Sequence, residues 1–284
     1  MSTSDIDAMS AEQRNEQAAL NYSTAHRLIT QSPLHAWHAH PVLNPDYRAE
    51  ESDAMDAGAI AHKILLGKGA DIVQIEAPDW RTKAAKEQRD AVRAERKLPI
   101  LAHKMRPIED MVHAARCALS SFAEVEIVLN EGDAERSLYW KEGDALCRAT
   151  PDWRHDSYAI LLDYKSTAGS AEPSAWIRSQ MHPMGYDLQG AFQLRGNHKN
   201  GGPIPERTTF MFLVQENYPP YACSFVGLSP ALYEIAERKR EYAVLLWRNC
   251  LASGKWNGYP QRIAYAEPTA WQVAEDEQRQ QEAE

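Results

Sequence analysis

The residues best suited to do chemistry lie in one short stretch of the chain. Pro151 and Asp152 are followed, after ten intervening residues, by Asp163, Tyr164 and Lys165. Two carboxylates offer the hard oxygen ligands that divalent cations prefer, and a lysine ammonium can orient a water molecule or help to deprotonate it. This is the chemistry of phosphodiester hydrolysis. An aspartate and a lysine two residues apart are otherwise typical of a surface ion pair, so the catalytic interpretation depends on the Pro-Asp pair at this distance.

Two strands must position these groups. Residues 159–162 form a short apolar run between polar turn residues, which predicts a buried strand that continues through Lys165. Because side chains alternate along a strand, Asp163 and Lys165 project from one face and Tyr164 from the other. Asp152 follows the strand-like segment 145–150. A turn through residues 154–157 would pair the two strands antiparallel and bring Asp152 back towards Asp163.

Three short strand-like runs, residues 125–129, 136–140 and 145–150, are separated by the turn sequences Asn-Glu-Gly-Asp and Lys-Glu-Gly-Asp. They predict a meander that joins the strand at 159–165 in a largely antiparallel sheet. Glu135 begins the second run. It is either a further carboxylate of the site or a solvated strand end.

The remaining pattern predicts helices and strands in alternation. We expect helices at 53–66, 81–106 (interrupted near Pro99), 107–122, 173–196 and 230–252, and strands at 72–75, 208–214 and 221–226. His62 lies in the first of these helices. A lone histidine on a buried helix is more often a hydrogen-bonded core residue than a ligand, but Gly58, Ala59 and Ala61 permit a close approach that would let His62 reach a metal at the sheet edge.

The length and composition of the 284 residues predict a single domain at 20–265 with additional terminal segments, a flexible N-terminus at 1–19 and a flexible acidic tail at 266–284. No apolar run approaches the roughly 18 residues of a membrane span. The N-terminus is not signal-like, so we expect a cytoplasmic protein without a membrane partner. The four cysteines are dispersed, which predicts free thiols rather than a zinc site or a disulfide framework.

The net charge of −9 argues against indiscriminate coating of nucleic acid. Residues 81–106, however, hold nine basic residues against three acidic ones, a net charge of +6, which leaves −15 for the rest of the chain. A basic segment on an acidic body suits a protein that admits DNA at one place. A solvated helix with mixed charges explains the composition equally well.

Several segments taken together, in order, resemble the RecE-type (exodeoxyribonuclease VIII) phage exonuclease family, and the Pro151-Asp152 and Asp163-Tyr164-Lys165 pair is similar to the PD-(D/E)xK signature of the wider RecB-like nucleases. The resemblance spans about residues 20–260. The segments that carry it are residues 32–33, 58–62, 134–140, 147–153, 163–167, 186–189, 215–221 and 254–259.

The resemblance implies an α/β (α+β) fold with a PD-(D/E)xK restriction-endonuclease-like core, in which helices flank a central mixed sheet that contains an antiparallel meander. By the same resemblance, Lys165 positions or activates the attacking water, Glu135 is a candidate contact to a second metal, and Gln189 matches the glutamine of a downstream motif. Gln193 stands where that motif has a tyrosine, so its role is left open. The implied metal ligands are His62, Asp152, Asp163 and the Tyr164 carbonyl.

The activity that the resemblance implies is Mg²⁺-dependent digestion of one strand of linear double-stranded DNA, 5′ to 3′, with Mn²⁺ as a substitute metal. It leaves 3′ single-stranded tails for recombination by strand annealing. The implied partners are DNA ends, further copies of the chain in a ring-shaped homo-oligomer (trimer or tetramer), and a phage single-strand annealing protein. The alternatives are another RecB-like nuclease of different polarity, or a DNA-end-binding or scaffold protein whose catalytic site has decayed. A RecB-like nuclease with an iron–sulfur cluster is disfavoured by the dispersed cysteines.

Overall fold

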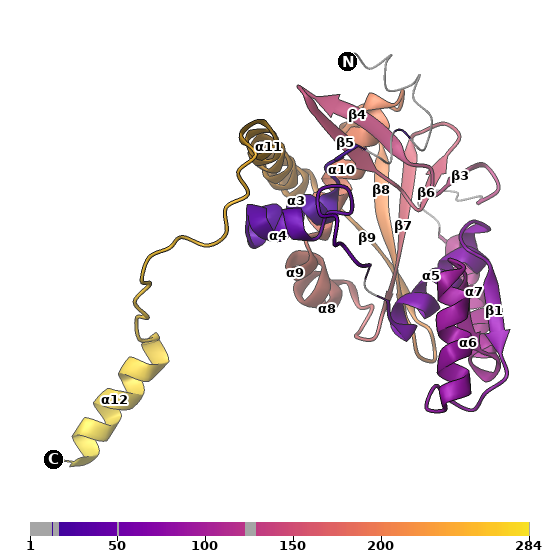
Figure 1. Ribbon diagram of the computed structural model, residues 1–284, viewed down its shortest axis with the longest axis horizontal. Coiled ribbons are helices and arrows are strands. Elements are labelled where there is room, and N and C mark those ends of the chain that lie inside the picture. The colour runs from indigo at the N-terminus through magenta and orange to yellow at the C-terminus, as the bar shows by residue number, and fades with distance from the viewer. Residues whose placement is uncertain (1–12, 14–16, 50, 123–128, 284) are drawn as a thin grey trace.

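A five-stranded mixed sheet forms the centre of the protein in the computed structural model, which describes residues 13, 17–49, 51–122 and 129–283 (Figure 1). The strand order is β3-β6-β7-β8-β9. Only β7 and β8 are parallel to each other, and the other neighbours are antiparallel. The strands are β3 (Gly132–Ala134), β6 (Trp153–His155), β7 (Ile160–Thr167), β8 (Thr209–Glu216) and β9 (Cys223–Gly227).

Helices cover both faces of this sheet because β7 and β8 are apolar on both sides. On one face, Leu162, Tyr164, Met211 and Leu213 pack against α5 (Asp53–Leu66) and α7 (Met105–Ser120) in one buried cluster. On the other face, Leu161, Phe210, Phe212 and Val214 meet Trp176, Met181 and Leu194. Strands that are buried on both faces read as continuous hydrophobic runs, as the parallel pair does here.

The helices on the second face come from the middle and the end of the chain. The predicted helix at 173–196 is divided, because Gly185 takes a left-handed conformation (φ 68°) that ends one helix and begins the next. The segments on this side are α8 (Pro173–Trp176), a π-helical turn (Ile177–Met181), α9 (His182–Met184), α10 (Tyr186–Lys199) and α11 (Pro230–Ser253). The strands β8 and β9 and the helix α11 confirm the elements predicted at 208–214, 221–226 and 230–252.

The predicted meander is confirmed in the pairing of its last two runs and wrong in joining them to the strand at 159–165. The strands β4 (Leu138–Glu142) and β5 (Ala145–Ala149) pair antiparallel with each other, as predicted, but in a two-stranded sheet separate from β7. Cys147 of β5 also forms a parallel bridge with Leu20. Trp140 and Cys147 from this hairpin pack with α10, α11, α3 (Tyr22–Thr30) and α4 (Pro33–His38) in their own core cluster. Two segments predicted as turns instead supply β3 and β6 of the main sheet. The predicted strand at 125–129 lies outside the described residues except for Leu129, which is in a turn.

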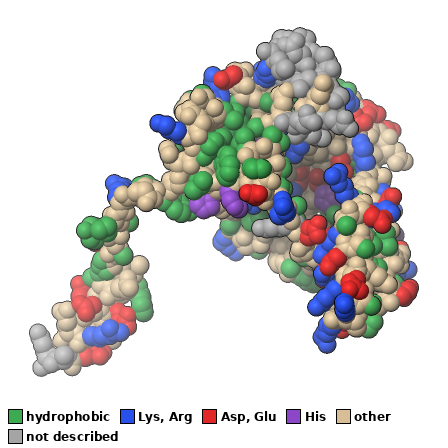
Figure 2. Space-filling model, viewed as in Figure 1, with side chains coloured by type: hydrophobic (Ala, Val, Ile, Leu, Met, Phe, Trp, Pro, Cys, Tyr) green, Lys and Arg blue, Asp and Glu red, His purple; other side chains and the backbone are tan. Residues whose placement is uncertain are grey.

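The basic segment 81–106 is not one interrupted helix. It forms α6 (Lys83–Ala94), β2 (Leu98–Leu101) and a short 3₁₀ helix (Ala102–Lys104), and β2 pairs in parallel with β1 (Ile72–Ile75). Arg93 donates to Asp53 and Asp56 of α5 at 3.1 and 2.6 Å. Figure 2 shows Lys and Arg side chains interspersed with Asp and Glu over this region. Part of the positive charge is therefore used within the protein, as the mixed-charge interpretation predicts.

The two ends of the chain differ in how they meet the body. The predicted flexible N-terminus, residues 1–19, lies largely outside the described residues. The predicted acidic tail contains the helix α12 (Ala270–Ala283), which extends away from the body (Figure 1). All four cysteines are free thiols, as predicted. None of the described helices is both long and apolar enough to cross a membrane.

Candidate active site

Asp163 and Lys165 lie side by side in the middle of the molecule, on the face of β7 that meets α10. The Lys165 ammonium donates to Asp163 Oδ1, and Asp163 is fully buried. Tyr164 points to the opposite face, where its hydroxyl donates to Gln215 Oε1 at 2.6 Å. Alternation along β7 thus places Asp163 and Lys165 on one face of the sheet and Tyr164 on the other, as the sequence predicts.

Asp152 joins this pair through a strand that the sequence did not predict. It immediately precedes β6, whose residue Trp153 pairs with Leu162 of β7. One step further along that register, Asp152 lies opposite Asp163. The Tyr164 backbone N–H donates to Asp152 Oδ2 at 2.7 Å. The two carboxylates are therefore neighbours, although β5 does not pair with β7.

His62 reaches the same place from α5. Its Nε2 lies 3.0 Å from the Tyr164 carbonyl oxygen and its Nδ1 lies 3.7 Å from Asp152 Oδ2. A carbonyl oxygen only accepts, so this contact assigns the proton of the neutral ring to Nε2 and leaves a lone pair on Nδ1. The pKa of His62 is lowered, chiefly by burial, which favours the neutral ring. The lone pair of His62 Nδ1 and the carboxylate oxygen of Asp152 then face each other, and a proton or a cation between these two acceptors would stabilise both.

The charge state of the cluster follows from its burial. Burial, followed by the charge of Asp163, holds the pKa of Asp152 well above its ordinary value. Burial lowers the pKa of Lys165, but the charges of Asp163 and Asp152 outweigh it and leave that pKa raised. The ammonium therefore stays protonated at neutral pH and acts as a donor. It also lies 5.0 Å from the centre of the Tyr186 ring.

Two glutamines of α10 hold the second oxygen of Asp163. Gln189 Nε2 and Gln193 Nε2 both donate to Asp163 Oδ2, at 2.6 and 2.7 Å. Four residues apart on a helix, they share one face. From the sequence, Gln189 and Gln193 share one helix face that could bind a phosphate, position a catalytic group or cap a packed surface, and the role of Gln193 is left open; the structure shows it positioning Asp163. The carboxamide oxygens of both glutamines are buried and have no hydrogen-bond partner within the described part of the chain.

Glu135 lies beside the cluster rather than within it. It falls between β3 and β4 and does not begin a strand, and its backbone is in the left-handed region (φ 49°). Its N–H donates to the Asp152 carbonyl oxygen at 3.0 Å. Its carboxylate is close enough to contribute to the raised pKa of Asp152.

The donor types of this cluster fit a divalent cation. His62 Nδ1 and Asp152 Oδ2 face each other, and Asp163 is next to them. A complete shell is not preformed. Among the described residues no three His, Cys, Asp or Glu side chains gather closely enough to hold a metal ion. Asp163 would have to exchange hydrogen bonds with Lys165 or the two glutamines in order to bind one.

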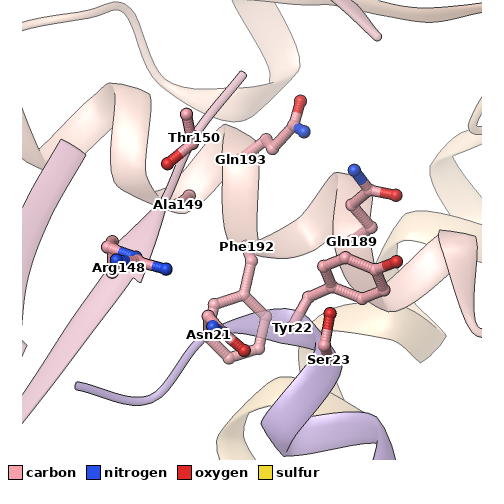
Figure 3. A pocket seen from close by; sticks show the side chains of 9 residues that line it. All are labelled: Asn21, Tyr22, Ser23, Arg148, Ala149, Thr150, Gln189, Phe192 and Gln193. Atoms are coloured by element: carbon pink, nitrogen blue, oxygen red, sulfur yellow. The ribbon is translucent and has the colours of Figure 1, made fainter. Parts of the chain in front are cut away.

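A pocket of about 190 Å³ opens beside the two glutamines (Figure 3). Gln189, Phe192 and Gln193 enter it from α10, opposite the start of α3 and the end of β5. Arg148 of β5 lines the pocket, and its guanidinium makes no hydrogen bond or ion pair with any described residue. The pocket therefore combines an available cation with neutral polar groups, next to the buried carboxylates.

Comparisons with known proteins agree with the fold. The sequence matches no protein-family model and no curated protein. The structure is similar to the crystal structure of a protein from Eubacterium rectale named "Putative exonuclease", with a TM-score of 0.58 and 11% sequence identity, over 94% of this chain and 97% of that chain. At this identity the likeness shows the fold alone. It confirms the predicted fold class, a mixed α/β core in which helices flank a mixed sheet.

Proposed function

We propose that this protein is a Mg²⁺-dependent exodeoxyribonuclease that degrades one strand of linear double-stranded DNA. The observation that carries the proposal is the convergence of Asp152, Asp163 and Lys165, with His62 facing Asp152. The name of the Eubacterium rectale protein supports the same class of activity. The 5′ to 3′ polarity, the use of Mn²⁺ in place of Mg²⁺, the ring-shaped homo-oligomer and the annealing-protein partner depend on the resemblance to RecE-type exonucleases.

In the proposed mechanism His62, Asp152 and Asp163 would hold the cation, with the Tyr164 carbonyl as an additional ligand. The chemistry expected of the bound cation is stabilisation of the charge that builds on the attacking and leaving oxygens of the phosphodiester. Lys165 is protonated, so it orients the attacking water and a phosphoryl oxygen by donating hydrogen bonds. The water oxygen bonds to phosphorus while one ester P–O bond breaks; the water releases one proton to solvent and the departing oxygen takes one up, so that the products are a hydroxyl and a phosphate monoester.

The residues around the cluster orient the Asp163 carboxylate and offer a contact for the DNA backbone. Gln189 and Gln193 hold Asp163 Oδ2 from the helix side, which leaves Asp163 little freedom to rotate. Arg148 offers the guanidinium that a backbone phosphate in the adjoining pocket would contact. An acidic protein can bind DNA in this way, because only the surface that meets the phosphates must be basic.

End-labelled linear duplex tests the proposal. With Mg²⁺ or Mn²⁺ we expect release of nucleotides from the 5′-labelled end first, no digestion of circular duplex, and no activity in EDTA. Asp163→Asn should abolish cleavage. Asp156→Asn is the matched control, because Asp156 is an exposed acid in the turn after β6.

Two results would overturn the assignment. Digestion by Asp163→Asn at the normal rate would remove the site from the reaction. Tight binding of duplex ends by the wild-type protein without cleavage under any of these metals would instead identify a DNA-end-binding protein.

A further inference from the structure

The C-terminal arm, residues 261–283, has no packing partner in the described body of the protein. Every side chain from 261 to 282 is exposed except that of Glu275, which is half-buried. The arm nevertheless carries large apolar groups: Ile263 is 76% exposed, Tyr265 81% and Trp271 71%. Figure 2 shows such side chains standing out along it. The last contacts with the body are made just before the arm, by Trp256, Asn257 and Tyr259.

Such an arm gains stability when a partner covers it. A helix of 14 residues, the length of α12, is marginal in water without tertiary contacts. Exposed tyrosine, tryptophan and isoleucine side chains gain free energy when they are buried. These residues are also the kind that anchor a peptide segment in an apolar groove.

An apolar groove of about 420 Å³ lies on the other side of the molecule, between α5, β2 and α7. It is lined by Ile60, Ile100 and Ile108, which belong to the main core cluster, and by Trp80. The volume falls in the range of roughly 300–1,000 Å³ that is typical of binding pockets. The groove can therefore accept one or two large side chains.

The charges around the groove are opposite to those of the arm. The helix α12 carries four acidic residues (Glu275, Asp276, Glu277 and Glu282) against one arginine. Two charged residues line the groove, Asp53 and Lys104, and the charge of Asp53 is met by its ion pair with an arginine of α6. The positive charge near the groove comes from Lys104, from Lys86 of α6 and from Arg96 between α6 and β2. None of these three cations has an ion-pair partner within the described ranges. Electrostatic complementarity of this kind orients an association.

We propose that the C-terminal arm of one copy docks in the α5-β2-α7 groove of a second copy. The arm leaves the body beyond α4 and α11, whereas the groove elements lie at the opposite side (Figure 1). The residues between the body and α12, numbers 261–269, span at most about 30 Å when fully extended. An arm that points away from its own groove in this manner reaches a neighbour. Two copies that exchange arms form a closed dimer, and copies that dock head to tail form a ring where the rotation from one copy to the next closes.

Light scattering after size exclusion tests the proposal with three variants. A chain that ends at Pro260 lacks the arm. Ala54→Trp fills the groove from an exposed position of α5, and Tyr242→Asp is the matched control at an exposed apolar residue of α11. We expect the full chain and Tyr242→Asp to form a closed oligomer, and both the truncated chain and Ala54→Trp to be monomeric with unchanged circular dichroism.

Mixing the two monomeric variants gives the decisive result. The truncated chain keeps its groove and Ala54→Trp keeps its arm, so one arm–groove contact can form and the mixture should stop at a 1:1 pair. A full chain that is monomeric, whether its arm is free or docked in its own groove, overturns the proposal. So does an oligomer that persists without the arm or with the groove filled, or a mixture that does not pair.

Discussion

Gln193 offers a quantitative test of the buried cluster, because its amide can be exchanged for a carboxyl group of the same shape. In Gln193→Glu, a carboxylate oxygen would take the place of the Nε2 atom that lies 2.7 Å from Asp163 Oδ2. Two unit charges at that distance repel by about 6 kcal/mol at an effective dielectric constant of about 20. The protein avoids this cost by keeping the new carboxyl protonated, since the protonated side chain at position 193 donates to Asp163 as the amide does.

The cost of that protonation sets the expected magnitude. Holding a proton at pH 7 on a carboxyl with an ordinary pKa of about 4.3 costs about 3.7 kcal/mol, at about 1.36 kcal/mol per unit. The folded state then binds one more proton than the unfolded state. The deficit in unfolding free energy therefore grows by about 1.4 kcal/mol per pH unit above about pH 4.3 and is nearly absent at about pH 4.5.

Urea denaturation of Gln193→Glu and the wild type in EDTA, from about pH 5 to about pH 8, measures this deficit. Gln193→Leu is the control without a titratable group. This variant loses a charge-assisted hydrogen bond, which destabilises the fold, but it also removes a buried oxygen that has no partner among the described residues, which stabilises it. Because the two effects are of similar size, the unfolding free energy of Gln193→Leu should differ from that of the wild type by less than about 1.5 kcal/mol at every pH. A Gln193→Glu deficit that does not vary with pH would refute the assigned contact between Gln193 and Asp163.

Three further outcomes follow from the described contacts. Lys165→Met leaves the fully buried Asp163 without its cation and should lower the unfolding free energy by about 3–5 kcal/mol in urea, whereas a loss below about 1 kcal/mol would contradict the buried ion pair of Lys165 with Asp163. Tyr164→Phe deprives Gln215 Oε1 of its donor and should cost about 1–3 kcal/mol in the same assay, with the m-value unchanged. Burial raises the pKa of Glu142, but hydrogen bonds from Arg195 and Trp140 and the charges of Arg240 and Arg195 lower it more. The stabilisation by Glu142 is therefore present above its ordinary pKa of 4.5 and is lost as the pH falls further. The difference in melting temperature between wild type and Glu142→Gln should accordingly shrink below about pH 4.5, and a constant difference would contradict it.

The features that the sequence predicts best are those that depend on residues adjacent in the chain. The apolar run before Asp163 and the alternation of Asp163, Tyr164 and Lys165 are local, and the strand and its two faces follow from them. Asp152 was expected near Asp163, and it is, but through β6 rather than β5. The three residues of β6 include Arg154 and His155 and carry no strand pattern of their own, so it is their pairing with β3 and β7 that makes them a strand.

The rest of the site depends on contacts between distant segments. The contact of His62 with Tyr164 joins residues 102 positions apart. The face of α10 that meets the sheet decides that Gln193 donates to Asp163, and the nearly uniform burial of that helix leaves no amphipathic pattern that could reveal it. Pro99 favoured a helix break, but nothing local indicated that residues 98–101 pair in parallel with β1.

The parallel pairing of β7 with β8 over eight residues determines on which face of the sheet Asp163 and Lys165 lie. Because side chains alternate, a slip of one residue in that pairing would turn Asp163 and Lys165 into the apolar layer beneath α5 and α7 and expel Tyr164 from it. Such a shifted chain would bury two charges among aliphatic groups and could not persist. A chain that folds stably therefore keeps this register, and with it the position of Asp163 beside Lys165.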